Sequence, residues 1–224
     1  MSAGNKRGAF IVMEGLDRSG KSTQAARLLE RLQRADARVK LLKFPDRTTG
    51  IGITIDSYLR SESELDDRAI HLLFSANRWE LASSIEESLR AGSTVLCDRY
   101  AFSGIAFSAA KGLPYEWCRA PDISLPAPDV TIFLDITPEK AKQRGGYGEE
   151  RYEKEEMQRM VREVFQRIGS ETSREQRWVV VDAGQDIDLV TEDIWRIVEP
   201  LVSGVLGPVT RLWETGSNTS IIPS

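Results

Sequence analysis

The sequence predicts an α/β fold in which a parallel β-sheet is covered by helices on both faces. Five short apolar runs, rich in β-branched or large side chains, recur along the 224 residues. The intervals between the runs are long enough for helices, and this alternation is typical of a parallel sheet with both faces covered. We see neither an internal repeat nor a low-complexity linker, so we expect one domain over residues 1–213.

The five predicted strands are the apolar runs themselves, at residues 9–13, 39–44, 94–97, 130–136 and 178–181. The first run is shorter than the core of a secretory signal, and it is far from the roughly 20 apolar residues that a membrane helix needs. We therefore expect neither a membrane span nor a cleaved signal.

Helices are predicted in the intervals, at residues 22–35, 65–91, 149–169 and 187–205. In the first of them Ala25, Leu28 and Leu32 recur at spacings of three and four, which places them on one apolar face. Gly92 is expected to end the second helix as a left-handed cap. The Pro-rich residues 114–128 predict a loop with a short helical turn before the fourth strand.

Charge and composition limit the kinds of partner and the cellular compartment that we expect for this protein. The chain carries 30 Lys and Arg against 34 Asp and Glu, a net charge of −4 without any block of like charge, so we expect no nucleic-acid partner. Cys97 and Cys118 match neither a zinc-ligand spacing nor a disulfide framework, which indicates two buried thiols in a reducing compartment. We expect a cytoplasmic location, with nuclear and mitochondrial pools left open. The single histidine, His71, is expected at a polar surface or a satisfied core position.

A phosphate-binding loop is predicted directly after the first strand. Residues 15–22 read G-L-D-R-S-G-K-S, which fits the pattern G-x-x-x-x-G-K-[ST], and they open the first amphipathic helix. Glycines let successive backbone N–H groups point at one centre, and the helix N-terminus adds about half a positive charge there. We expect Lys21 to reach the β- and γ-phosphates of a nucleoside triphosphate, and the Ser22 hydroxyl to ligate Mg²⁺.

Two charged residues inside this loop need their own explanation. Arg18 lies close to the expected γ-phosphate, where it would act as a built-in arginine finger. Asp17 places a carboxylate beside a polyanion, which is unfavourable unless the carboxylate faces a hydroxyl donor. The alternative is that both are solvated loop charges.

Asp98 and Arg99 form a second candidate element, at the end of the third predicted strand. An Asp beside the phosphate loop commonly supports Mg²⁺, although Asp135 and Asp182 also end apolar runs. Arg99 favours the first of these candidates, because an arginine at that strand end can hold a second phosphate group opposite the nucleotide.

Three further features point to an acceptor site. Phe74 and Arg78 are four residues apart on a predicted helix, so they would combine a stacking surface with a fork of donors, unless Phe74 belongs to the core. Arg47, just past the second strand, is either a phosphate ligand or a surface charge. Residues 142–152 place three glycines among basic and aromatic residues, which indicates either a mobile lid or an ordinary helix connection.

Taken together, these segments resemble the thymidylate kinases, nucleoside monophosphate kinases that phosphorylate dTMP with ATP. The resemblance runs from Gly8 to about Trp213, and the Asp-Arg pair in the loop is similar to the eukaryotic and poxviral branch. It is carried by E-G-L-D-R-S-G-K-S-T-Q at 14–24, F-P-D-R at 44–47, H-L-L-F-S-A-N-R-W-E at 71–80, D-R-Y-A-F-S-G at 98–104, L-P-A-P-D at 125–129 and G-E-E-R-Y-E at 148–153.

The resemblance implies a three-layer P-loop kinase fold with a five-stranded parallel sheet, a short lid at about 142–152, and a homodimer. The sequence departs from the family at Ala127, where the family often has Lys, and at Glu149, which adds a negative charge beside a lid glycine. Residues 214–224 extend past the usual end and are expected to be a disordered tail.

The resemblance also implies a role for each site residue. Asp17 would bind the 3′-hydroxyl of dTMP, Phe74 would stack on thymine and Arg78 would donate to a thymine carbonyl. Arg47 and Arg99 would hold the dTMP phosphate, Ser103 and Phe107 would lie around the base, and Tyr152 would lie against the deoxyribose. The residues expected to bind ATP are Gly15, Asp17, Arg18, Ser19, Gly20, Lys21, Ser22, Thr23 and Arg144, with Ser22 and Asp98 at Mg²⁺.

The expected reaction is in-line transfer of the γ-phosphoryl group of Mg-ATP to dTMP, with Arg18, Lys21 and Arg99 as the catalytic residues. The alternatives are another deoxynucleoside or nucleoside monophosphate kinase and, more remotely, a regulatory P-loop GTPase. The GTPase would need a guanine-reading N-K-x-D segment, which the sequence does not contain.

Overall fold

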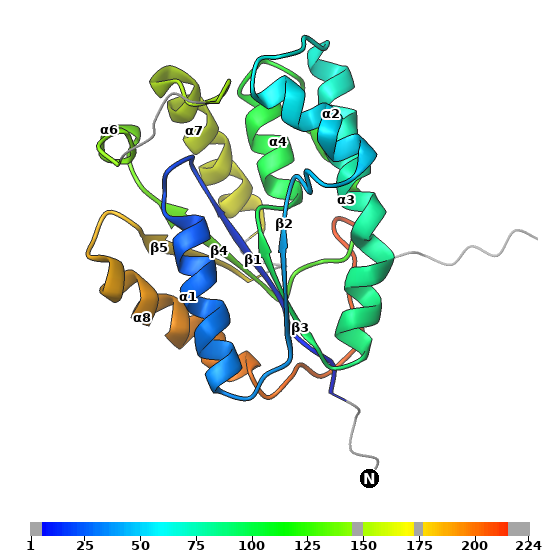
Figure 1. Cartoon of the computed structure of the whole chain (residues 1–224), viewed down its shortest axis with the longest axis vertical. Coiled ribbons are helices and arrows are strands. Elements are labelled where there is room, and N and C mark those ends of the chain that lie inside the picture. Colours follow the sequence, from blue (N-terminus) through cyan, green and yellow to red (C-terminus); the bar gives the residue numbers. More distant parts are fainter. Residues whose placement is uncertain (1–5, 145–149, 173–176, 215–224) are drawn as a thin grey trace, which may run out of the picture.

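The computed structural model describes residues 6–144, 150–172 and 177–214, and these contain one parallel sheet of five strands (Figure 1). The strands are β1 (Phe10–Gly15), β2 (Val39–Lys43), β3 (Thr94–Asp98), β4 (Val130–Asp135) and β5 (Trp178–Asp182). Their order across the sheet is β2-β3-β1-β4-β5, and every pairing is parallel. Each predicted apolar run therefore holds a strand, and the predicted fold class is confirmed.

Burial explains why these runs could be recognised. All residues of β1 and β3 are buried, as expected for inner strands covered on both faces, whereas the edge strands β2 and β5 are partly exposed. Strands β1 and β3 are neighbours, and Met13 is paired with Asp98. The phosphate loop after β1 and the residues after Asp98 therefore leave the sheet side by side at its carboxyl edge, where parallel α/β sheets bind their ligands.

The helices form two groups. In Figure 1, α1 (Lys21–Arg34) and α8 (Ile187–Val198) pack together on one side of the sheet, whereas α3 (Asp67–Arg90), α4 (Ala101–Ala109) and α7 (Glu155–Thr172) gather on the other. Helix α2 (Gly50–Leu59) packs on α3. The shorter helical segments are α5 (Tyr115–Arg119), α6 (Pro138–Lys142) and two 3₁₀ turns, η1 (Ala120–Asp122) and η2 (Glu199–Leu201). Among the described residues, none of these helices has the length and apolarity needed to cross a membrane.

Two predicted helix boundaries are wrong. Helix α7 begins at Glu155 rather than at 149, because the backbone N–H of Arg151 donates to Leu59 O (3.0 Å) and draws the preceding turn towards the end of α2. Helix α8 ends at Val198 rather than at 205, because Pro200 cannot continue the helix and a 3₁₀ turn follows. The predicted cap at Gly92 is confirmed: its φ is +79°, and Gly92 and Ser93 donate to Leu89 O and Ser88 O in a Schellman motif.

His71 lies in the core and joins three helical segments. It is fully buried on α3, where its Nε2 is 3.0 Å from Cys118 O and its Nδ1 is 2.8 Å from Ser108 Oγ. Because a carbonyl oxygen can only accept, Nε2 carries a proton, and in the neutral ring Nδ1 accepts from the Ser108 hydroxyl. Burial is the main cause that lowers the pKa of His71 below its usual 6.5, and the nearby Arg78 acts in the same direction while Asp122 opposes it.

Acidification should therefore destabilise the fold through His71. Below pH 6.5 the unfolded chain takes up a proton that the folded ring resists, so the free energy of unfolding falls as the pH is lowered from 7 to 5. Urea unfolding of the wild type and of His71→Gln, measured at both pH values, checks this. The variant should lose less stability on acidification than the wild type, and equal losses in the two proteins would contradict the assignment.

Candidate active site

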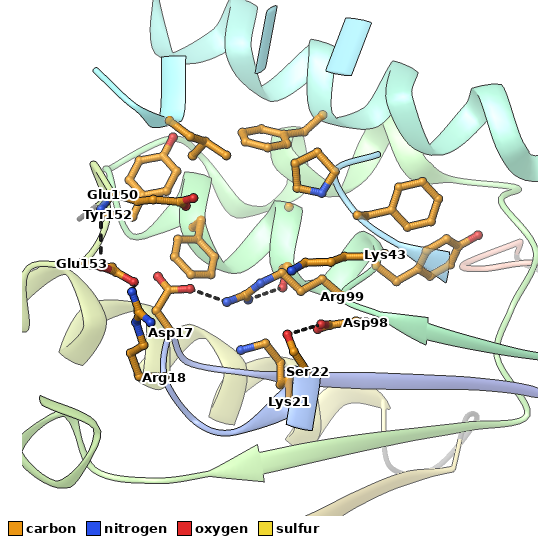
Figure 2. A pocket seen from close by; sticks show the side chains of 18 of the residues that line it. Asp17, Arg18, Lys21, Ser22, Lys43, Asp98, Arg99, Glu150, Tyr152 and Glu153 are labelled. Atoms are coloured by element: carbon orange, nitrogen blue, oxygen red, sulfur yellow. Dashed lines mark hydrogen bonds and ion pairs between the residues drawn. The ribbon is translucent and has the colours of Figure 1, made fainter. Parts of the chain in front are cut away.

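A cavity of about 480 Å³ opens at the carboxyl edge of the sheet (Figure 2). It brings together all the site residues predicted from the sequence except Gly15 and Ser19, which lie buried in the loop beneath it. The predicted residues that line the cavity are Asp17, Arg18, Gly20, Lys21, Ser22, Thr23, Arg47, Phe74, Arg78, Asp98, Arg99, Ser103, Phe107, Arg144 and Tyr152.

The phosphate loop forms the floor of this cavity. Gly20, the residue before α1, has φ +95°, and a Cβ there would lie 3.2 Å from Arg144 Nη1. The Lys21 ammonium group folds back over the loop and donates to Leu16 O and Ser19 Oγ. Burial is the main cause that lowers the pKa of Lys21 to about 7, with repulsion from Arg99 adding to it and three carboxylates opposing it. The arrival of an anion at this site would therefore stabilise the protonated form of Lys21.

The residues present fit a magnesium ion beside this loop. Ser22 Oγ donates to Asp98 Oδ2 (2.7 Å), while Asp98 Oδ1 is buried without a hydrogen-bond partner in the described part of the chain. Hydroxyl and carboxylate oxygens are ligands that Mg²⁺ prefers. Since residues 6–144, 150–172 and 177–214 contain no cluster of three metal-binding side chains, phosphate and water oxygens would complete the coordination.

A partly buried chain of hydrogen bonds fixes Arg99 above the loop. Arg99 donates to Gly15 O (3.0 Å), to Ser103 Oγ (3.0 Å) and to Asp17 Oδ1. Ser103 Oγ in turn donates to Glu14, a fully buried carboxylate that also accepts from the N–H groups of Tyr100 and Ser103. Burial raises the pKa of Glu14, and these hydrogen bonds and the charge of Arg99 oppose that rise. The guanidinium group of Arg99 is thereby held in one place before any ligand binds.

Two other arginines predicted to bind phosphate are held by carboxylates. Arg47 pairs with Asp56 (2.6 Å) and Glu150 (2.7 Å), and Arg18 Nε donates to Glu153 Oε1 (2.9 Å). Figure 2 shows Glu150 and Glu153 above the phosphate loop. Glu150 lies within the segment predicted as a lid, residues 142–152, and Glu153 directly follows it. Residues 145–149 of that segment, Glu149 included, lie outside the described residues.

The far wall of the cavity is aromatic. Phe107 and Tyr152 pack with their ring centroids 5.5 Å apart, and the guanidinium group of Arg99 lies 5.2 Å from the centroid of Phe107. Phe74 packs against a small cluster that includes Ile55 and Tyr152, and it also lines the cavity. Phe74 can therefore belong to the core and also line the cavity, because one face of its ring can pack in the cluster while the other face meets the cavity.

Sequence reasoning gave no site role to several residues in or beside the cavity, namely Glu14, Lys43, Gly104, Asp122, Glu150, Glu153 and Gln158. Gln158 accepts from Asp17 N (2.9 Å) and donates to Asp17 Oδ2 (2.7 Å), which orients that carboxylate. A charged residue within an apolar run was a signal that could have singled out Glu14. Gln158 gives no such signal, because its partner lies in a distant loop.

The fold and the cavity define a P-loop phosphotransferase in which a second set of arginines faces the phosphate loop. The model of the thymidylate kinase family matches residues 13–194. The chain is 52% identical to the thymidylate kinase of Schizosaccharomyces pombe, covering 89% of this chain and 93% of that protein, and 44% identical to the human one, covering 93% and 99%. The solved thymidylate kinase of Candida albicans superposes with a TM-score of 0.85 at 40% identity, over 92% and 99% of the two chains.

The chain therefore belongs to the thymidylate kinase family. This membership confirms the resemblance inferred from the loop and from the segments that follow it, including the likeness to eukaryotic sequences.

Proposed function

We propose the following division of roles in this thymidylate kinase, which transfers the γ-phosphoryl group of ATP to dTMP and so forms ADP and dTDP. One observation carries the proposal: a single cavity is lined by Lys21 and Arg18 of the phosphate loop and also by Arg47 and Arg99. Figure 2 shows Arg99 above Lys21. Two phosphate-bearing substrates can therefore meet there, with the transferring group between the two sets of cations.

In the proposed mechanism an oxygen of the dTMP phosphate attacks the γ-phosphorus in line, and the bond to the β–γ bridging oxygen of ATP breaks. No general base is needed, because the second pKa of a phosphate monoester is about 6 and the attacking oxygen is already largely anionic at neutral pH. Lys21, Arg18 and Arg99 neutralise the charge that spreads over the transferring group. Mg²⁺, held through Ser22 and Asp98, would supply further charge neutralisation on the donor phosphates.

The acceptor end is proposed to bind dTMP by a combination of charge and stacking. Arg47 and Arg99 hold its phosphate, and Asp17 accepts from its 3′-hydroxyl. Phe74 stacks on thymine while Ser103 and Phe107 surround the base, and Tyr152 lies against the deoxyribose. Arg78 donates to a thymine carbonyl.

At the donor end the backbone of the loop from Gly15 through Ser19 to Thr23 is proposed to cradle the phosphates of ATP. Arg144 is proposed to take part there, because its Nη1 donates to Arg18 O (3.2 Å) and its Nη2 donates to Ala183 O (2.6 Å), which places the guanidinium group beside Gly20. Closure of residues 142–152 over the nucleotide would exclude water and limit ATP hydrolysis.

The experiment that tests this function is an ADP-release assay across nucleoside monophosphates with a no-acceptor control. Rapid ADP release with dTMP and little without an acceptor is expected. Faster turnover with another monophosphate would indicate a different acceptor specificity, and equal release without any acceptor would contradict the kinase mechanism.

Arg18 provides the sharpest test of the donor side. Its backbone has φ +59°, so Arg18→Gly leaves the loop unstrained while it removes the guanidinium group. We expect kcat to fall by about 10²- to 10³-fold with little change in the KM for ATP, because the contact strengthens as charge develops. Arg27→Ala, which removes an arginine from the surface of α1, is the control. Unchanged turnover of Arg18→Gly would refute the role.

Asp17 provides a matching test of the acceptor side. A hydrogen bond to a charged group is worth about 1.5 to 3 kcal/mol, so Asp17→Asn should lower kcat/KM for dTMP by about 10- to 100-fold. The fractional loss on the 3′-deoxy analogue should be smaller, because that acceptor lacks the hydroxyl. The ribonucleotide analogue should be a poor substrate of the wild type, since Tyr152 excludes a 2′-hydroxyl. Equal fractional losses on dTMP and its 3′-deoxy analogue would mean that Asp17 serves only the loop.

We also propose that the chain forms a homodimer through α2 and α3, and that it works in the cytoplasm. Ile53, Leu72 and Trp79 on these two packed helices are exposed apolar side chains, which favours their burial against a second copy. Cys97 and Cys118 are free thiols, as suits a reducing compartment. Sedimentation equilibrium should give twice the 25.1 kDa chain mass, and a monomer at micromolar concentration would contradict the first proposal.

A further inference from the structure

We propose that Gly104 and Asp122 together fix the guanidinium group of Arg78 so that it selects a base with a carbonyl group at the recognised position. The inference deepens the proposed function, on which it rests, by identifying the residues that give the acceptor end its base specificity. Neither residue touches the expected phosphate positions, and both act through Arg78.

The first observation is an ion pair buried beneath the acceptor end. The Arg78 side chain on α3 is 3% exposed, and that of Asp122 in η1 is fully buried. Asp122 accepts from Arg78 Nε (3.1 Å) and from Arg78 Nη2 (2.6 Å). Asp122 Oδ1 also accepts from Ser75 Oγ (2.7 Å), which holds the carboxylate itself. One edge of the guanidinium group is therefore fixed by two parallel hydrogen bonds.

The second observation is that the other edge of the Arg78 guanidinium group has N–H donors that Asp122 does not use. A guanidinium group carries five N–H donors, and Asp122 accepts only from Nε and from one hydrogen of Nη2. Within the described residues Arg78 Nη1 makes no hydrogen bond, although Arg78 is buried and lines the cavity. Arg78 Nη1 is not sealed from solvent, so the free donors of this edge are open to an acceptor that arrives with the ligand.

The third observation is the close approach of Gly104. A Cβ at this position in α4 would lie 2.7 Å from Arg78 Nη2, 3.0 Å from Nη1 and 3.1 Å from Cζ. The guanidinium group cannot retreat from a larger residue without breaking the pair with Asp122. A helix interior favours alanine over glycine by about 1 kcal/mol, so helix propensity does not explain a glycine here. The close contact with Arg78 explains the glycine at position 104.

The chemistry of selection follows from these contacts. An edge that only donates pairs with a carbonyl oxygen of thymine or uracil. An exocyclic amino group at the same position, as in cytosine, would set donor against donor. Such unpaired polar groups are what give hydrogen-bonding sites their strong discrimination.

Gly104→Ala is the direct test, and Gly50→Ala is its matched control. Gly50 is the first residue of α2, and a Cβ there meets nothing within 4 Å. In Gly104→Ala the KM for dTMP should rise about 10- to 100-fold while the KM for ATP is unchanged. The ratio of kcat/KM for dTMP to that for dCMP should fall at least about tenfold. The ratio of dTMP to dUMP should stay at its wild-type value, because both bases carry the same carbonyl groups. Gly50→Ala should change none of these quantities.

Asp122→Asn is the second variant, and it decides the matter if Gly104→Ala does not fold. It should lower the dTMP to dCMP ratio in the same way, because an amide places a donor against one guanidinium nitrogen and frees the group to turn. If both folded variants keep the wild-type ratio, the inference is overturned even where activity on all acceptors falls. A wild type that prefers no thymine nucleotide would instead overturn the proposed function itself.

Discussion

The hydrogen-bond chain from the buried Glu14 through Ser103 and Arg99 to Asp17 is the constraint on which the rest of the site depends. A carboxylate inside an apolar strand costs several kcal/mol unless donors surround it. Here two backbone N–H groups at the start of α4 and the Ser103 hydroxyl offset that cost. These hydrogen bonds therefore connect β1, the first turn of α4 and the phosphate loop. The position of Arg99 relative to the phosphate loop is a consequence.

Carboxylates hold the other arginines that are proposed to bind the substrates. Asp56 and Glu150 hold Arg47, Glu153 holds Arg18, and Asp122 holds Arg78. In each case the negative partner fixes a long side chain in advance, so less conformational entropy is lost when a substrate binds. Such preorganised charge is usually the largest contribution to phosphoryl transfer. The acidic residues at 150 and 153 are thus as much a part of the proposed site as the arginines.

Much of this fold could be predicted from the sequence, and the exceptions have physical causes. Strands β1 and β3 were evident because both faces of an inner parallel strand are apolar. Helix α4 was missed because Phe102, Ile105 and Ala106, together with the small polar residues between them, are all buried, so the helix has no polar stripe. Helix α2 begins Gly-Ile-Gly-Ile, a run with low helix propensity that tertiary packing on α3 overrides.

The site, too, contains residues that could be predicted from the sequence and residues that could not. Residues that belong to a local motif, such as Lys21 and Ser22, could be predicted as site residues because their spacing along the chain reflects their chemistry. Asp122 and Gln158 could not, because each acts on a side chain more than 40 residues away in sequence. Only the folded chain brings these partners together.

We propose that one cavity binds dTMP and the donor phosphates on opposite sides of the transferring group. A crystal structure with dTMP and ADP bound tests it most directly. The account predicts the dTMP phosphate on Arg47 and Arg99, its 3′-hydroxyl on Asp17, its base against Phe74, and the ADP phosphates on the loop around Lys21. A dTMP phosphate seated on the phosphate loop, or a base bound away from Phe74, would contradict it.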